Sequence, residues 1–119
     1  MNSLTSNITM FFTNYLPNTV GYSENTIKSY RDTFVLLFLY AEEEHLTKRG
    51  KISIELFHKD TIVAFLEWLE IKRAASVSTR NQRLAALKSF SRYMSLNTVE
   101  YLDTFQAVLD IPPKKGPSK

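Results

Sequence analysis

Hydrophobic residues recur every three or four positions along most of this chain, which is the spacing of one face of an α-helix. The pattern predicts a first helix from about Leu4 to Tyr15. Pro17 should end it, because proline disfavours helical backbone at the residue before it, and a turn over residues 18–21 should follow. A second helix is expected from the cap residue Ser23 to about Glu43.

Two further amphipathic segments predict a third and a fourth helix. The third should begin near Asp60 and bury one stripe made of Ile62, Phe65, Leu66 and Leu69. Ser76 or Ser78 can cap the fourth helix. Its inner face should carry Leu84, Leu87, Phe90, Ser91 and Met94, and its outer face Gln82, Ala86, Ser89 and Tyr93.

The remaining segments are less regular. Residues 45–57 predict a loop, because the alternation from Ile52 to Leu56 suggests a short extended piece that has no obvious partner strand. The sequence Asn97-Thr98-Val99-Glu100 has the form of a capping box and predicts a short fifth helix over residues 99–109. Beyond it, two prolines and a few basic and small residues, 111–119, predict a tether.

These elements predict an all-α fold, a compact bundle of four helices plus a short fifth helix, formed by residues 1–110. Only three glycines and four prolines occur in 119 residues, which disfavours a turn-rich β fold. The chain has no cysteine, so disulfides and thiolate metal sites are excluded. It has no apolar run of about 20 residues to span a membrane, nor the start of a signal peptide, so we expect a cytoplasmic protein.

Charge is distributed unevenly along the chain. The net charge is only +3, but residues 71–99 hold six basic residues and no acidic one. This cluster of positive charge has two interpretations: a solvated helix face without a binding role, or a binding site for a polyanion. The six residues, called the basic segment below, are Lys72, Arg73, Arg80, Arg83, Lys88 and Arg92.

Catalytic and metal chemistry find little support in the sequence. The only histidines, His45 and His58, have no ligand-type partner at helical spacing, so we expect no metal. The three glycines are isolated, so no phosphate-binding loop is expected. We therefore predict no catalytic residue and no cofactor.

Two helix starts combine small polar and basic side chains, which suits a nucleic acid. Helix N-termini present amide groups to phosphates, and Asn, Gln, Lys and Arg can bond to base edges. Arg80 and Arg83 lie near the apolar stripe, so they could instead lie along the core edge or pair with an acidic residue of a neighbouring helix. The predicted DNA-binding residues are Asn25, Lys28, Ser29, Lys72, Arg73, Ser78, Thr79, Arg80, Gln82, Arg83 and Lys88.

Several segments resemble the tyrosine recombinase (phage integrase) family. Ser23, Thr26 and Tyr30 match the S-x-x-T-x-x-x-Y start of a helix in that family, and residues 78–94 are similar to a later one. Residues 62–69 resemble the helix between them, and residues 111–115 resemble the linker to the catalytic domain.

The resemblance implies the N-terminal core-binding domain of a site-specific recombinase, with a helical SAM-like fold. In that family this domain grips one face of duplex DNA, and its last helix contacts other protomers of a DNA-bound assembly. The catalytic residues, including the nucleophilic tyrosine, belong to the domain after the linker. None of the six tyrosines here is therefore expected to be that nucleophile.

Two other classes of function stay open at this point. One is a helical protein-interaction module whose basic face meets an acidic partner, and the other is a free-standing helix-turn-helix regulator. The predicted tether argues against the regulator. We expect the chain to be monomeric without DNA and to have no membrane partner.

Overall fold

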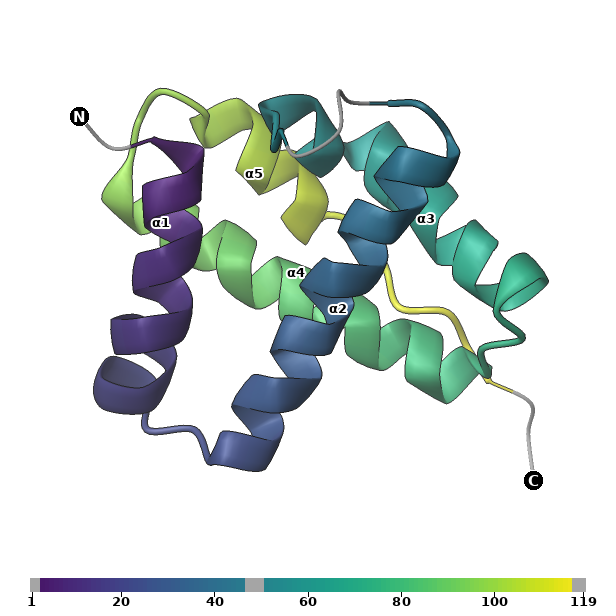
Figure 1. Ribbon diagram of the computed structural model, residues 1–119, viewed down its shortest axis with the longest axis horizontal. Coiled ribbons are helices and arrows are strands. Elements are labelled where there is room, and N and C mark those ends of the chain that lie inside the picture. The colour runs from purple at the N-terminus through teal and green to yellow at the C-terminus, as the bar shows by residue number, and fades with distance from the viewer. Residues whose placement is uncertain (1–2, 47–50, 117–119) are drawn as a thin grey trace.

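The computed structural model describes residues 3–46 and 51–116, and within them it contains helices and no strand (Figure 1). The predicted all-α class is therefore confirmed. The elements in chain order are α1 (Leu4–Met10), the wide-turned helix η1 (Phe11–Val20), α2 (Glu24–Glu43), the single 3₁₀ turn η2 (Ile54–Phe57), α3 (Lys59–Lys72), α4 (Val77–Asn97) and α5 (Leu102–Leu109).

Helix α4 is the centre of the arrangement. It contacts α2, α3 and α5, and α2 also packs against η1 (Figure 1). Such a helix buries more than one stripe. The expected outer face is therefore wrong for Ala86, Ser89 and Tyr93, all of which are buried, whereas Gln82 is exposed as predicted. The predicted inner face is buried throughout.

The first helix does not end at Pro17. It continues to Val20 as the π-helix η1, in which each backbone N–H bonds to a carbonyl one residue further back than in an α-helix. Proline removes one N–H donor, and a widened turn keeps its ring away from the preceding carbonyl. The chain leaves the helix at Gly21, whose φ of 82° lies in the left-handed region. The amides of Gly21 and Tyr22 both donate to the Leu16 carbonyl, so the predicted turn over residues 18–21 is wrong.

Serine caps fix the beginnings of the two long helices. Ser23 Oγ accepts from the Thr26 amide at 3.3 Å, as predicted, and α2 ends at Glu43. Ser76 Oγ accepts from the Thr79 amide at 3.1 Å, so Ser76 is the cap of α4. Ser78 lies inside the first turn of that helix and is exposed.

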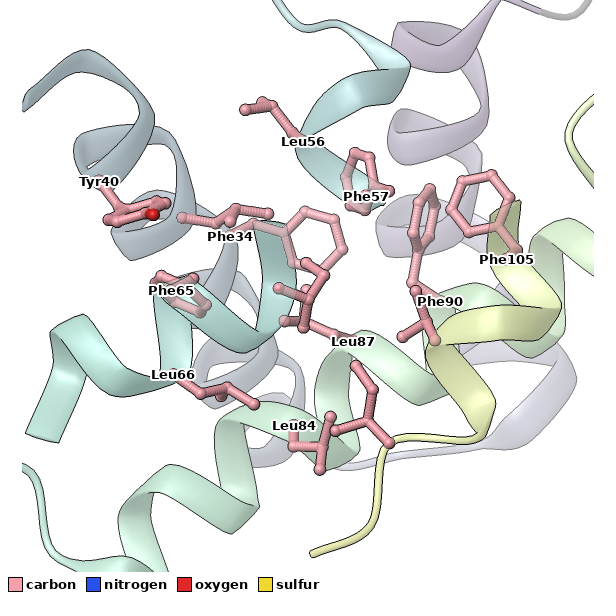
Figure 2. Close-up of a cluster of buried hydrophobic side chains, with 14 of the residues drawn as sticks. Phe34, Tyr40, Leu56, Phe57, Phe65, Leu66, Leu84, Leu87, Phe90 and Phe105 are labelled. Carbon is pink, nitrogen blue, oxygen red and sulfur yellow. The ribbon is translucent and has the colours of Figure 1, made fainter. Parts of the chain in front are cut away.

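Aromatic rings lie at the centre of the core, among leucine and other aliphatic side chains (Figure 2). Phe90 of α4 lies 5.2 Å from Phe34 of α2 and 5.6 Å from Phe105 of α5, between ring centroids. Phe57 lies 5.3 Å from Phe90, although it comes from the segment predicted as loop. Leu56 and Phe57 are each only 1% exposed. The turn η2 therefore covers the core, while residues 47–50 of the same segment lie outside the described residues.

The C-terminal helix begins later than predicted. Asn97 is not a cap: it is the last residue of α4, and its side-chain amide donates to the Tyr93 carbonyl at 2.7 Å. A turn follows, and α5 buries Phe105 and Val108. Ile111, just beyond it, is 2% exposed, so the chain is still anchored in the core where the extended segment 112–116 begins.

Candidate nucleic-acid interface

One face of α4 presents four residues to solvent, although the buried Ser89 interrupts it between Ala85 and Arg92. Ser78, Gln82, Ala85 and Arg92 are exposed and recur at helical spacing, and we call them the α4 stripe. The helix carries no acidic residue, so nothing on it offsets the charge of Arg92 or of the half-buried Lys88. Amide groups at the N-terminus of α4 add a positive potential at the Ser78 end of the stripe.

Arg83, on the side of α4 that faces α2, fastens the two helices together. Its guanidinium donates to the Ser29 carbonyl at 3.1 Å and to Thr33 Oγ1 at 3.2 Å. Thr33 is buried, and its hydroxyl also donates to the Ser29 carbonyl. The structure thus brings Ser29 beside α4, and it gives Arg83 an internal role.

Arg80 is also engaged within the fold. Its Nε lies 3.8 Å from Glu70 Oε1 of α3, and its side chain is 11% exposed. Its Nη1 donates to Asn81 Oδ1 at 2.9 Å. The alternative expected from the sequence, pairing with an acidic residue of a neighbouring helix, is thus what the structure shows for Arg80. Arg83 also contacts a neighbouring helix, but through a carbonyl and a hydroxyl group.

Lys72 and Arg73 lie in a separate hollow at the end of α3. They share it with Trp68 and with two acidic residues at the end of α2, Glu43 and Glu44. The Arg73 guanidinium lies 5.7 Å from the centre of the Trp68 ring, which is a cation–π distance. The nearby carboxylates lower the positive potential that a phosphate would meet here.

Asn25 and Lys28 line a hollow between η1 and the first turns of α2. Arg31, which is exposed, and the acidic Glu24 also line it, so the hollow holds two cations and one carboxylate. The sequence reasoning did not select Arg31 or Arg92 as site residues. Only their helical spacing could have indicated that they share a face with the selected residues, since Arg31 follows Lys28 by three positions and Arg92 follows Ala85 by seven.

A groove follows the beginning of α4. It is lined by Ser76, Val77, Ser78, Asn81, Gln82 and Ala85 of the helix, and by Gly116 of the C-terminal segment. Thr79 is half-buried, and its hydroxyl accepts from Ser76 Oγ at 3.1 Å. Gln82 and Ser78 are therefore the predicted residues with polar side chains in this groove.

The tyrosines with perturbed acidity are held in their neutral form. Burial raises the pKa of Tyr30, Tyr40 and Tyr93 above the ordinary value of 10.0. Tyr22 adds to the effect at Tyr30, and Tyr15 adds to it at Tyr93. Burial is the largest cause of the shift at all three tyrosines, so these side chains suit packing roles.

The described ranges 3–46 and 51–116 contain no candidate for a metal site or for a membrane-spanning helix. No group of three or more His, Asp or Glu side chains in that part of the chain could hold a metal ion. No helix there is both long enough and apolar enough to cross a bilayer.

Comparison with known proteins gives a consistent result. The family described as "Phage integrase, N-terminal SAM-like domain" matches residues 11–98. Two proteins of Sinorhizobium fredii are similar, "Putative integrase/recombinase y4rC" at 38% identity over 113 residues and "Putative integrase/recombinase y4rD" at 37% over 91. The alignments cover 95% and 76% of this chain but 34% and 32% of those proteins, so the chain spans about a third of their length. No solved structure matches.

Proposed function

This chain belongs to the phage integrase (tyrosine recombinase) family as its N-terminal SAM-like domain, and from that membership we propose that it binds duplex DNA for a site-specific recombinase. The observation that carries the proposal is the α4 stripe. It is exposed, begins at a helix N-terminus, lies on a helix without acidic residues and includes one cation. Such a helix face can enter a major groove.

The side chains divide into two proposed roles. Gln82 and Ser78 have polar groups in the groove at the start of α4, so they are proposed to meet base edges. Lys28, Lys88 and Arg92 are proposed to meet phosphates, which set affinity and its salt dependence. Asn25, Ser29 and Thr79 would support the first role from the beginnings of α2 and α4.

Other predicted site residues receive a smaller part in this proposal. Arg80 and Arg83 are proposed to orient α4 through Glu70 and through α2 rather than to meet DNA directly. Lys72 and Arg73 share their hollow with carboxylates, so each should contribute less than Arg92.

We further propose that the chemistry of recombination resides in a catalytic domain that follows a linker beginning at residue 111. The helical domain described above would then bind DNA beside other recombinase protomers. The relatives are about three times as long as this chain, which leaves room for such a domain in them. Incubation of the purified chain with duplex DNA should yield no covalent adduct on a denaturing gel, and an adduct would contradict this assignment.

Fluorescence anisotropy with labelled duplexes tests the binding proposal. Affinity should fall with salt, and Arg92→Gln should flatten the slope of log K against log salt by about 0.9 if one phosphate contact is lost. Lys59→Gln is the matched control, because Lys59 is exposed at the start of α3, outside the basic segment, and its loss changes the net charge equally. An equal effect of both variants would refute the role of the α4 stripe.

Base reading by Gln82 requires a preferred site, which selection from a random duplex pool can supply. Gln82→Ala should then weaken binding to the selected site by about 1–3 kcal/mol and binding to random duplex much less. Equal losses on both duplexes would remove Gln82 from the base-reading role. Binding to polyglutamate as tight as to duplex would favour an acidic protein partner over DNA.

A further inference from the structure

The segment after α5 turns back toward the beginning of α4. Figure 1 shows it as the yellow trace that passes along α4 and ends near the N-terminal end of that helix. Ile111, at its start, is buried in the core, so the direction of the segment is set where it leaves α5. The segment lies beyond residues 11–98, which are the part that the family description matches.

Asn81 of α4 holds the backbone of this segment with two hydrogen bonds. The amide of Lys114 donates to Asn81 Oδ1 at 2.9 Å, and Asn81 Nδ2 donates to the carbonyl of Lys114 at 2.7 Å. A carboxamide has the same donor and acceptor pair as a peptide group, so both polar groups of Lys114 are satisfied at once.

Two further contacts reinforce this attachment. Lys114 Nζ lies 3.0 Å from Glu70 Oε2 of α3, and the other oxygen of Glu70 faces Arg80. A Cβ atom placed on Gly116 would lie 3.8 Å from Val77 Cγ1, so the segment is still against the first turn of α4 at that residue.

The sequence of the segment lowers the entropic cost of docking it. Pro112 and Pro113 restrict the backbone, so less freedom is lost when the segment is ordered. The side chains of α3 and α4 that bind it lie 44 and 33 positions away in sequence, respectively, so these contacts are tertiary and depend on the folded domain.

We propose that residues 112–116 are a docked strap, held by Asn81 and Glu70, which fixes the point at which the chain leaves this domain beside the first turns of α4. Asn81 and Glu70 are thus positioning residues. The chain therefore reaches residue 116 beside the groove that contains Ser78 and Gln82, since Gly116 is one of the residues that line it. The contacts that hold the strap are all within this chain, so this inference does not rest on DNA binding.

Hydrogen exchange of the Lys114 amide tests the strap directly by NMR on the whole chain without DNA. In the native chain this amide should exchange at least tenfold more slowly than in an unstructured peptide. Asn81→Ala should abolish that protection while the amides of α5 stay protected. Asn97→Ala is the matched control, because Asn97 lies on the same helix and bonds only to its own turn at Tyr93.

Glu70→Gln separates the ion pair from the backbone bonds. It should raise the exchange rate of the Lys114 amide less than Asn81→Ala does, and it should speed tryptic cleavage between Lys114 and Lys115. Exchange of the native Lys114 amide at the rate of an unstructured peptide would overturn the proposal. An unchanged rate in Asn81→Ala would overturn it as well.

Discussion

Replacing Arg83 with methionine should destabilise the fold, whereas replacing Arg92 in the same way should weaken DNA binding and leave stability unchanged. Both arginines belong to α4 and to the basic segment, but their surroundings differ. The guanidinium of Arg83 bonds to Ser29 and Thr33 of α2, while Arg92 is exposed on the α4 stripe. Methionine keeps the apolar stem of either side chain, so the comparison isolates the charged group.

The size of the effect follows from the bonds that are lost. A hydrogen bond to a charged group contributes about 1.5–3 kcal/mol. Both bonds of Arg83 come from one nitrogen, and the Ser29 carbonyl keeps the hydroxyl of Thr33 as a donor. The expected loss for Arg83→Met is therefore the value of about one such bond, which for a domain of this size lowers Tm by roughly 4 °C per kcal/mol. Arg92→Met should stay within about 0.5 kcal/mol, as exposed substitutions do.

Urea unfolding followed by circular dichroism measures the stability of each variant. Anisotropy titrations with a duplex, at temperatures where the variant is folded, measure the salt slope. Arg92→Met should reduce that slope by about 0.9, and Arg83→Met should keep it. Adding Thr33→Val to Arg83→Met should cost less than the sum of the single losses, because the two residues share a bond. A stable Arg83→Met variant with a flattened slope would refute the assignment of Arg83 to the fold.

Three further predictions concern stability. Gly21→Ala should cost about 1–2 kcal/mol, because φ at Gly21 is 82°, whereas Gly116→Ala should cost nothing measurable by the same urea unfolding. Phe57→Ala should lower the free energy of unfolding by about 3–5 kcal/mol, measured by thermal unfolding. The control His58→Ala, a change at the exposed neighbouring residue, should lower it by less than about 0.5 kcal/mol. Burial raises the pKa of Tyr93, so its contribution to the free energy of unfolding is present below pH 10 and is lost as the pH rises through the folded pKa. Tyr93→Phe should therefore make the fall of the unfolding free energy at alkaline pH shallower.

Local signals in the sequence were sufficient for the long helices. The cap at Ser23, the end of α2 near Glu43 and the buried stripe of α3 follow from periodicity and capping alone. The failures lie where tertiary packing overrides a local rule. Pro17 stays inside a helix because the widened turns of η1 accommodate it, and a proline signal cannot reveal such a widening.

The segment around Phe57 shows why an irregular sequence can still supply core residues. A four-residue turn has no periodicity to detect, and the sequence gave no indication that two of its three apolar side chains, Leu56 and Phe57, point into the core. They are buried because α4 and α5 leave a space that Phe57 fills beside Phe90 and Phe105. Long-range packing of this kind is decided by helices that are distant in sequence.

Charge in the sequence marks a region, and only the structure shows what each cation does there. The basic segment contains six cations without an acid among them, yet Glu70 binds Arg80 and the hollow of Lys72 and Arg73 contains the carboxylates of α2. These acids lie outside the segment, so no local charge count includes them. Net charge along a sequence therefore overstates the potential that a ligand would meet. The exposed face of α4, where Arg92 lies and no acid of that helix opposes it, is for this reason the place where the proposed contact with phosphates can be tested with a single substitution.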